Sequence, residues 1–272
     1  MTILDTIAEK TRERIEEEKR RVSSAALKEK VQEILERENA GLGNGGGAGR
    51  RSFEAALAKD GMNFICEVKK ASPSKGIIAE YFPYAEIAKT YEKAGADALS
   101  VLTEPFYFLG SDDYLREIRK QVSIPILRKD FTVDEYMIYQ AKEMGADAVL
   151  LICSILSKLQ LSEYLGLTKA LGLSALVETH DDNEIEMALT AGARIIGVNN
   201  RNLKDFTVDA GNSARLRGSV PKDRIFVSES GIKTRSDVAG LEAAGVNAVL
   251  VGETLMRSED KKAMLDELAG RR

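Results

Sequence analysis

A carboxylate and an ammonium group stand two residues apart at the end of an apolar run in this sequence. The run Phe64–Val68 has the composition of a buried strand, and Glu67 and Lys69 lie at its carboxyl end. Side chains at positions i and i+2 of a strand point to the same face, so the two groups leave the strand together. Each charge favours the ionised form of the other. Taken alone, the pair is equally well explained as a surface ion pair, which stabilises a protein little.

The residues after this pair suit an anion, because the sequence Ser-Pro-Ser-Lys-Gly at 72–76 offers hydroxyl groups, a cation and flexible backbone. Polar groups also follow the later apolar runs. Desolvating a charge at a buried strand end is costly unless the charge is paired, so structural reasons explain such groups poorly. We therefore infer that the charged side chains among them share one polar pocket, namely Glu67, Lys69, Lys129, Glu178, Arg201 and Glu229.

The elements that position these groups follow a regular alternation from residue 63 onward. Apolar strand-like runs are expected at Phe64–Val68, Ala98–Leu102, Ile124–Leu127, Ala148–Ile152, Ala175–Val177, Ile195–Val198, Ile225–Val227 and Ala248–Val251. Helix-like segments are expected at Tyr84–Ala94, Asp112–Gln121, Asp134–Met144, Ser157–Leu171, Asp181–Ala191, Asp209–Arg217, Thr234–Ala244 and Lys261–Leu268. This alternation predicts an α/β fold, the (β/α)₈ TIM barrel. The rival, a doubly wound open sheet, usually has a glycine-rich first turn, which we do not find.

The chain before the first strand predicts an N-terminal extension. Residues 2–38 carry apolar residues at helical spacing and mixed charges, which indicates two solvated helices rather than a nucleic-acid-binding arm. The glycine-rich stretch 41–49 follows a helix and lacks the Lys-Ser/Thr of a phosphate loop, so a flexible connector is expected. We predict one catalytic domain over residues 1–272, in which 1–46 is the helical extension with its connector.

Composition excludes several other classes. The net charge of −4 gives no sign of nucleic-acid binding, and apolar residues make up an ordinary 44% of the chain. Cys66 and Cys153 lie in apolar runs, which predicts buried thiols in a reducing compartment. His180, the only histidine, falls at a helix start and is expected to cap it or to lie at the surface. With no signal peptide or apolar span in the sequence, we predict a cytoplasmic protein that does not enter a membrane.

The carboxyl ends of barrel strands carry the active site in enzymes of this fold. After the last two strands, Ser230-Gly231 and Gly252-Glu253 are each expected to open a helix, where backbone N–H groups favour an anion. Barrels often hold a phosphate at this corner, and glycine lets the backbone approach its oxygens. The alternative is a pair of ordinary glycine turns.

These motifs together resemble the indole-3-glycerol phosphate synthase family, along essentially the whole chain. The resemblance implies a carboxy-lyase (decarboxylase) of tryptophan, hence aromatic amino-acid, biosynthesis. It would convert 1-(2-carboxyphenylamino)-1-deoxyribulose 5-phosphate into indole-3-glycerol phosphate, CO₂ and water, with neither a metal nor an organic cofactor. The motifs that carry the resemblance are Cys66–Gly76, Leu99–Glu104, Leu127–Phe131, Val177–Glu178, Ile196–Leu203, Ser228–Ile232 and Val251–Met256.

The resemblance also implies roles for particular residues. Lys129 would protonate the substrate ketone, with its pKa lowered by Lys69 or Arg201. Glu178 would be the base of the dehydration, assisted by Glu67 and Lys69. Phe131 would form an apolar wall for the aryl ring, and the loop at 72–76 would cover the substrate. The expected substrate-binding residues are Ser72, Phe131, Asn199, Arg201, Glu229, Ser230, Gly231, Gly252 and Glu253, the last through its N–H with its carboxylate turned away from the phosphate.

Two alternatives stay open. The first is another phosphate-binding barrel, such as a phosphoribosylanthranilate isomerase, which resembles a Cys/Asp acid–base pair; strand alternation should turn Cys66 away from the pocket. The second is a non-catalytic barrel, which a missing Lys129 or Glu178 would have favoured, yet both are present. The expected partner is a phosphorylated small molecule, with the chain a monomer or weak homodimer.

Overall fold

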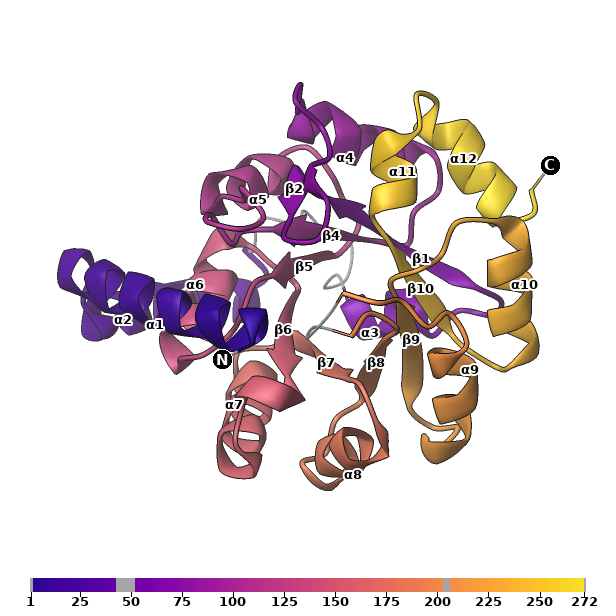
Figure 1. The fold of residues 1–272 in the computed structure, drawn as a ribbon. Coiled ribbons are helices and arrows are strands. Elements are labelled where there is room, and N and C mark those ends of the chain that lie inside the picture. Colours follow the sequence, from indigo (N-terminus) through magenta and orange to yellow (C-terminus); the bar gives the residue numbers. More distant parts are fainter. Residues whose placement is uncertain (1, 43–51, 203–205, 272) are drawn as a thin grey trace.

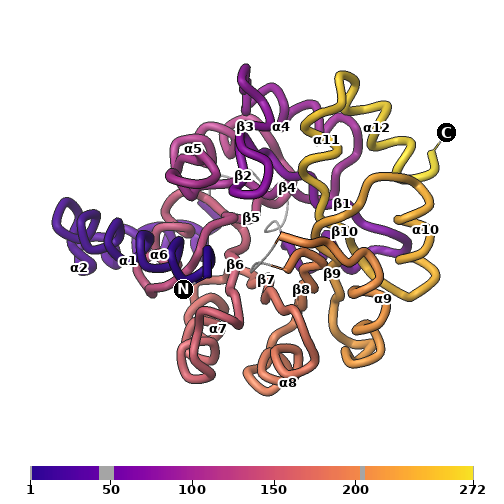
Figure 2. The backbone as a smooth tube through the Cα atoms, viewed as in Figure 1, coloured from indigo at the N-terminus to yellow at the C-terminus, as the bar shows by residue number. Residues whose placement is uncertain are grey.

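The computed structural model describes residues 2–42, 52–202 and 206–271. Within these ranges, eight parallel strands close into a barrel in the order β1-β10-β9-β8-β7-β6-β5-β4 (Figures 1 and 2). The predicted (β/α)₈ barrel is confirmed, and the open sheet is excluded. The strands are β1 (Asn63–Val68), β4 (Ala98–Leu102), β5 (Ile126–Lys129), β6 (Ala148–Ile152), β7 (Ser174–Thr179), β8 (Ile195–Asn199), β9 (Ile225–Glu229) and β10 (Ala248–Val251).

Helices cover the outside of the barrel (Figure 1). They are α4 (Tyr84–Lys93), α5 (Asp112–Arg119), α6 (Glu135–Met144), α7 (Lys158–Ala170), α8 (Asp182–Thr190), α9 (Asn212–Leu216), α10 (Arg235–Ala243) and α12 (Lys261–Leu268). Helix α9 is shorter than the predicted 209–217, because Asp209 Oδ1 accepts a hydrogen bond from the N–H of Gly211 in a turn before the helix. Strand β5 begins after Pro125, which has no N–H for a strand ladder, and it extends to Lys129, which pairs with Leu102 of β4.

Several short elements were not predicted. They are α3 (Phe53–Leu57), the hairpin of β2 (Ala71–Ser72) and β3 (Gly76–Ile77), and the 3₁₀ turns η1 (Cys153–Ile155) and η2 (Arg217–Ser219); the helix expected to open at Gly252-Glu253 is α11 (Glu253–Arg257). Phe53 and Leu57 of α3 are fully buried and pack with the residues of the barrel interior. Short elements of this kind lack the periodicity that marks longer ones, which explains why the sequence pattern missed them.

Alternation along β1 separates an inner from an outer layer of the core. Phe64, Cys66 and Val68 pack under the surrounding helices, whereas Ile65 belongs to the barrel interior and Glu67 lines a cavity. Cys66 and Cys153 are both buried, as predicted, and burial raises the pKa of both thiols. The Cys66 thiol therefore lies outside the barrel interior, which removes the support for an isomerase with a cysteine in the pocket.

The N-terminal extension consists of α1 (Ile3–Arg21) and α2 (Ser24–Asn39), as expected. Helix α1 begins at a capping box in which Thr2 and Asp5 bind each other's backbone N–H groups, and α2 packs on α6. Most of the glycine-rich stretch 41–49 lies outside the described residues, so the connector stays a prediction. In the described part of the chain, no helix is both long and apolar enough to cross a membrane.

Candidate active site

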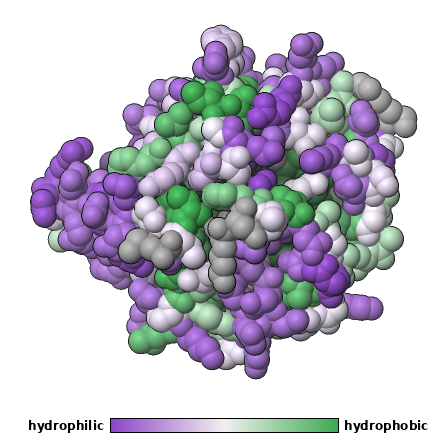
Figure 3. All heavy atoms as spheres, viewed as in Figure 1, coloured by the Kyte–Doolittle hydropathy of each residue, from purple (hydrophilic) through white to green (hydrophobic). Residues whose placement is uncertain are grey.

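A cavity of about 790 Å³ lies at the carboxyl ends of the barrel strands. Figure 3 shows apolar side chains gathered in the middle of the face seen in Figure 1, with hydrophilic side chains around them. Every site residue expected from the sequence lines this cavity, and their convergence supports the single shared pocket. They are Glu67, Lys69, Ser72, Lys129, Phe131, Glu178, Asn199, Arg201, Glu229, Ser230, Gly231, Gly252 and Glu253.

Three strands bring an ammonium group between two carboxyl groups. Lys129 Nζ, from β5, lies 3.2 Å from Glu178 Oε2 on β7 and 3.7 Å from Glu229 Oε2 on β9. The other oxygen of Glu178 accepts a hydrogen bond of 3.1 Å from Asn199 Nδ2 on β8. All these side chains are largely withdrawn from solvent, with Glu178 and Glu229 only 2% exposed. The arrangement can donate one proton and accept another within a few ångströms.

A second ion pair stands at the end of β1. Lys69 Nζ contacts Glu67 Oε1 at 2.5 Å, and Ser100 Oγ donates to the other oxygen of Glu67 at 3.3 Å. A Cβ atom at Gly252 would come within 2.5 Å of Glu67 Oε1 and 2.9 Å of Lys69 Nζ. A side chain at 252 would therefore displace this ion pair, whereas the sequence suggested only the approach of an anion.

The pKa of Lys129 is raised, so the lowered pKa expected from Lys69 or Arg201 is wrong. Burial disfavours the ammonium, but the nearby carboxylates, with Glu178 and Glu229 the largest contributors, outweigh burial. The sequence could not show this, because those carboxylates come from strands far along the chain. Lys129 is consequently fully protonated at neutral pH.

The two carboxyl groups beside Lys129 differ in protonation. Burial and the neighbouring Glu178 raise the pKa of Glu229 to about 8, and Glu229 Oε1 is buried without a hydrogen-bond partner in the described chain. Burial also acts against the charge of Glu178, but Lys129, His180 and Asn199 outweigh it and lower the pKa. At neutral pH, Glu178 is therefore a carboxylate that can accept a proton, and Glu229 is a carboxylic acid that can donate a hydrogen bond.

Apolar side chains form one wall of the cavity. The rings of Phe108 and Phe131 lie 6.2 Å apart between centroids, and Ile3, Leu4 and Ile7 of α1 line the same cavity. The sequence analysis placed Phe131 here but missed the other four. Helical spacing marked Ile3, Leu4 and Ile7 as a packing face, yet nothing in the sequence showed what they pack against.

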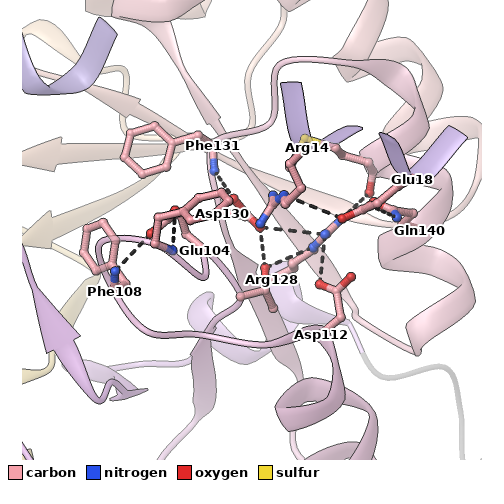
Figure 4. Close-up of polar contacts among 12 residues, drawn as sticks. Arg14, Glu18, Glu104, Phe108, Asp112, Arg128, Asp130, Phe131 and Gln140 are labelled. Carbon is pink, nitrogen blue, oxygen red and sulfur yellow. Dashed lines mark hydrogen bonds and ion pairs between the residues drawn. The ribbon is translucent and has the colours of Figure 1, made fainter. Parts of the chain in front are cut away.

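A buried network holds Asp130, the residue between Lys129 and Phe131 (Figure 4). Asp130 Oδ2 accepts hydrogen bonds from Thr103 Oγ1 at 2.6 Å and from Arg14 Nη2 of α1 at 2.9 Å. Burial works against this carboxylate, but Arg14 and Arg128 outweigh burial and lower its pKa. The side chain of Arg14 is only 12% exposed, so the expectation of a solvated α1 is wrong on the face that contacts the barrel.

Two further acceptors support the same region. Asp112 Oδ1 accepts from Arg128 Nη2 at 3.0 Å, and Glu104 accepts hydrogen bonds from the N–H groups of Tyr107 and Phe108 (Figure 4). Glu104 is completely buried and lies outside the cavity, where it fixes the loop that carries Phe108. Glu104, although it stands at a strand end, therefore positions a residue of the apolar wall and does not line the cavity itself.

The ends of β9 and β10 form a corner lined by small residues and cations. Gly252 is the N-cap of α11, as expected, but Ser230-Gly231 does not open a helix, because α10 begins at Arg235 with Thr234 as its N-cap. Lys75, the cation of the 72–76 loop, lines the cavity as expected, and Lys233 and Arg257, which were not expected, line it as well. The carboxylate of Glu253 is balanced by Arg257 Nε at 3.1 Å and Lys75 Nζ at 3.8 Å.

Asn200, which the sequence analysis did not single out, connects this corner to its surroundings. Its Nδ2 donates to the carbonyl of Ser230 at 3.0 Å and to Ser228 Oγ at 3.1 Å, while its Oδ1 accepts from both the N–H and the Oγ of Ser213. Ser230 has a φ of 69°, which non-glycine residues rarely adopt. Asn200 therefore holds Ser230 in this conformation.

Arg201 lines the cavity beside Asn199. Its backbone N–H donates to Asn199 Oδ1 at 3.0 Å, and its Nη1 donates to the carbonyl of Phe206 at 3.2 Å. His180, by contrast, neither caps a helix nor lies free at the surface, because the N-cap of α8 is Asp181 and the ring contacts Glu184 and Glu178. Within the described ranges, no group of three or more His, Cys, Asp or Glu side chains could hold a metal ion.

Comparison with known proteins places the chain among one set of enzymes. A family model described as indole-3-glycerol phosphate synthase matches residues 4–268. The indole-3-glycerol phosphate synthase of Ruminiclostridium cellulolyticum is 53% identical over 268 residues, covering 98% of this chain and 99% of that protein. That of Endomicrobium trichonymphae is 61% identical over 217 residues, covering 80% and 84%. The 3-hexulose-6-phosphate synthase of Salmonella typhimurium is only 13% identical, covers 77% of this chain and 97% of its own, and shares the fold with a TM-score of 0.64.

Proposed function

The chain belongs to the indole-3-glycerol phosphate synthase family, and from this premise we propose how its residues divide the work of the reaction. The enzyme is a carboxy-lyase of tryptophan biosynthesis. It closes the indole ring of 1-(2-carboxyphenylamino)-1-deoxyribulose 5-phosphate with loss of CO₂ and water. The observation that carries the proposal is the ammonium group of Lys129, held between Glu178 and Glu229 at the polar end of an apolar-walled cavity.

Lys129 is the general acid of ring closure. Its ammonium group donates a proton to the ketone oxygen of the substrate, which makes the ketone carbon electrophilic towards the aryl carbon. The carboxyl group on that aryl carbon then leaves as CO₂, and the electron pair of the broken bond restores the aromatic ring. The raised pKa keeps Lys129 charged before the substrate binds, so the proton is always available.

Glu178 is the base of the dehydration that follows. As a carboxylate it removes a proton from the ring-closed intermediate, while the ammonium group of Lys69 gives a proton to the hydroxyl group, which leaves as water. Asn199 orients Glu178 through the hydrogen bond at 3.1 Å. Glu67 and Lys69 assist these proton transfers from the opposite side of the cavity, and the protonated Glu229 binds the substrate as a hydrogen-bond donor.

The aryl end of the substrate binds to an apolar surface of the cavity, and the phosphate end binds to a polar one. Its aryl ring packs against Phe131 and the other apolar residues of the wall, and Asn199 and Arg201 orient the ribulose portion. Its phosphate binds at the corner described above, where Lys75 and Arg257 add positive charge. The residues proposed to bind the phosphate are Ser72, Ser230, Gly231, Gly252 and Glu253, the last through its N–H.

We extend the proposal to the domain organisation, the binding partner and the oligomeric state of the chain. Residues 1–272 act as one catalytic domain, which is supported by the contribution of α1 to the wall of the cavity. The partner is the phosphorylated small-molecule substrate, and the chain does not bind nucleic acid. We also propose that the enzyme is a cytoplasmic monomer or weak homodimer.

The activity can be tested directly. Purified protein mixed with 1-(2-carboxyphenylamino)-1-deoxyribulose 5-phosphate in the presence of a chelator should give the fluorescence of the indole product. A parallel reaction with phosphoribosylanthranilate as the substrate should give no product. Turnover of the second substrate, or no indole signal from the first, would contradict the proposed function.

Replacing Asn200 by alanine should weaken substrate binding more than it slows the chemistry. The variant loses the hydrogen bond from Asn200 to the Ser230 carbonyl, so the phosphate corner is no longer fixed. We expect KM to rise about tenfold, which corresponds to about 1.4 kcal/mol, with kcat changed far less. We also expect the free energy of unfolding to fall by about 1–3 kcal/mol, because buried partners lose their hydrogen bonds.

Steady-state kinetics and chemical denaturation measure the two effects separately. Asn212→Ala serves as the matched control, because Asn212 donates to the carbonyl of His180 at 3.3 Å and does not contact Ser230. A loss of stability in Asn200→Ala without any rise in KM would show that Asn200 serves the fold alone.

A further inference from the structure

The ring of His180 lies between two carboxylates, behind the proposed base. His180 Nε2 is 3.7 Å from Glu178 Oε1, on the oxygen that also accepts from Asn199. On the other side of the ring, His180 Nδ1 is 3.0 Å from Glu184 Oε2, and the same oxygen accepts the backbone N–H of His180 at 2.8 Å. Glu184 belongs to α8 and fixes both the backbone and the ring of His180.

One of the two ring nitrogens of His180 makes no hydrogen bond with the described part of the chain. His180 Nε2 is buried and has no hydrogen-bond partner in the described chain, although the side chain as a whole is 20% exposed. His180 is not among the residues that line the substrate cavity, whereas Glu178 is. Besides Glu178 and Glu184, the charged and titratable groups around the Glu178–His180 pair are Lys129 of β5, Glu229 of β9 and Cys153 of η1.

We propose that His180, oriented by Glu184, is a positioning residue whose imidazolium charge keeps Glu178 ionised and ready to accept a proton. The proposal rests on the proposed role of Glu178 as base. Burial in the barrel disfavours a carboxylate, and Lys129 balances the charge of Glu178 from one side only. A second cation on the far side of Glu178 compensates burial without occupying space that the substrate needs.

The direction of the pKa shifts agrees with this arrangement. Burial acts against the imidazolium, but the hydrogen bond to Glu184 and the charge of Glu178 outweigh it and raise the pKa of His180. Below this raised pKa the ring is positive and lowers the pKa of Glu178. Removing the positive charge must therefore raise the pKa of Glu178, so that a higher pH is needed to ionise the base.

His180 is the only histidine of the chain, so its titration can be followed by NMR without assignment, in protein that carries no histidine tag. We expect the imidazole of the wild-type protein to titrate above the ordinary pKa of histidine. Glu178→Gln and Glu184→Gln should each lower that pKa by about half a unit or more, because each removes a neighbouring negative charge. A histidine pKa that neither substitution changes would overturn the proposal.

The catalytic consequence is read from the pH dependence of kcat/KM. In His180→Gln, the acidic limb of the profile should move to higher pH by about one unit, while the rate well above that limb stays near that of the wild type. Glu184→Gln should move the limb in the same direction by a smaller amount. Asn212→Ala, which removes the hydrogen bond to the His180 carbonyl and one from Arg215 at the surface, should leave the limb unmoved.

The possible outcomes separate this proposal from the one on which it rests. If Glu178→Gln turns over at the wild-type rate, the assignment of Glu178 as base fails, whatever the titration of His180 shows. If Glu178→Gln is inactive but the acidic limb of His180→Gln coincides with that of the wild type, the base stands and the role of His180 is overturned. The NMR titration of the wild type and Glu178→Gln decides the question even if His180→Gln does not fold.

Discussion

Lys129→Ala is expected to lower kcat by about a thousandfold or more while the barrel stays folded. The variant loses the proton donor, and it also loses the cation that faces the carboxyl groups of Glu178 and Glu229. Without that cation, the pKa of Glu178 rises, so less of the base is ionised at neutral pH. Both halves of the reaction therefore suffer from one substitution. Steady-state formation of the fluorescent indole product measures the loss.

Lys158→Ala is the matched control, because it removes one lysine from an exposed position on α7. Circular dichroism and thermal unfolding should show a folded barrel in both variants. Substrate turnover by Lys129→Ala at a rate close to that of Lys158→Ala would contradict the assignment of Lys129 as general acid.

Glu178→Gln is expected to lower kcat by about a hundredfold to ten-thousandfold with a modest change in KM. Glutamine keeps the shape of the side chain but cannot take up the proton in the dehydration. The other buried carboxyl group provides the comparison, because the pKa of Glu229 is raised to about 8 and the group is already neutral at pH 7. Glu229→Gln thus exchanges one neutral group for another and should cost far less activity.

Kinetics at pH 7 compare the two variants directly. Equal losses in Glu178→Gln and Glu229→Gln would mean that the two carboxyl groups share one role, which contradicts the division between base and hydrogen-bond donor. The rates of the wild type and Glu229→Gln should also draw closer above pH 8, where Glu229 of the wild type loses its proton and with it the hydrogen-bond donor that glutamine keeps.

The positions of the site residues could be predicted from the sequence because they follow from strand alternation. Inward-facing and outward-facing residues alternate along β1, so Glu67 faces the cavity and Cys66 faces the helices. The same reasoning placed Lys129 and Glu178 at the ends of their strands. Once the number and order of strands favour a barrel, side chains at those ends converge on one cavity.

The electrostatic state of the site could not be predicted in the same way. The sequence suggested a lowered pKa for Lys129, because Lys69 and Arg201 were the cations expected to lie near it. The structure places Glu178 and Glu229 closer, and their distances of 3.2 Å and 3.7 Å depend on the curvature of the barrel. Sequence patterns give the direction in which a side chain points, but they do not give the distances between groups on different strands.

Contacts between distant segments were missed for the same reason. Arg14 looked like one of many charges on a solvated helix, yet it binds Asp130 in a buried network. Ser230 looked like the start of a helix, yet its carbonyl is held by Asn200 in a left-handed conformation. Both contacts join residues that no local pattern relates.

The position of the first turns of α1 at the cavity affects how the enzyme can be attached to other molecules. Ile3 lies in the wall of the cavity, and the label N in Figure 1 stands at the inner end of α1, beside the barrel strands, whereas C stands at the outer edge of the molecule beyond α12. A carrier protein or a surface linker joined ahead of Thr2 would thus emerge beside the entrance through which the substrate passes. One joined after Arg271 would extend from the periphery, so immobilised or fused forms of the enzyme should be tethered at that end.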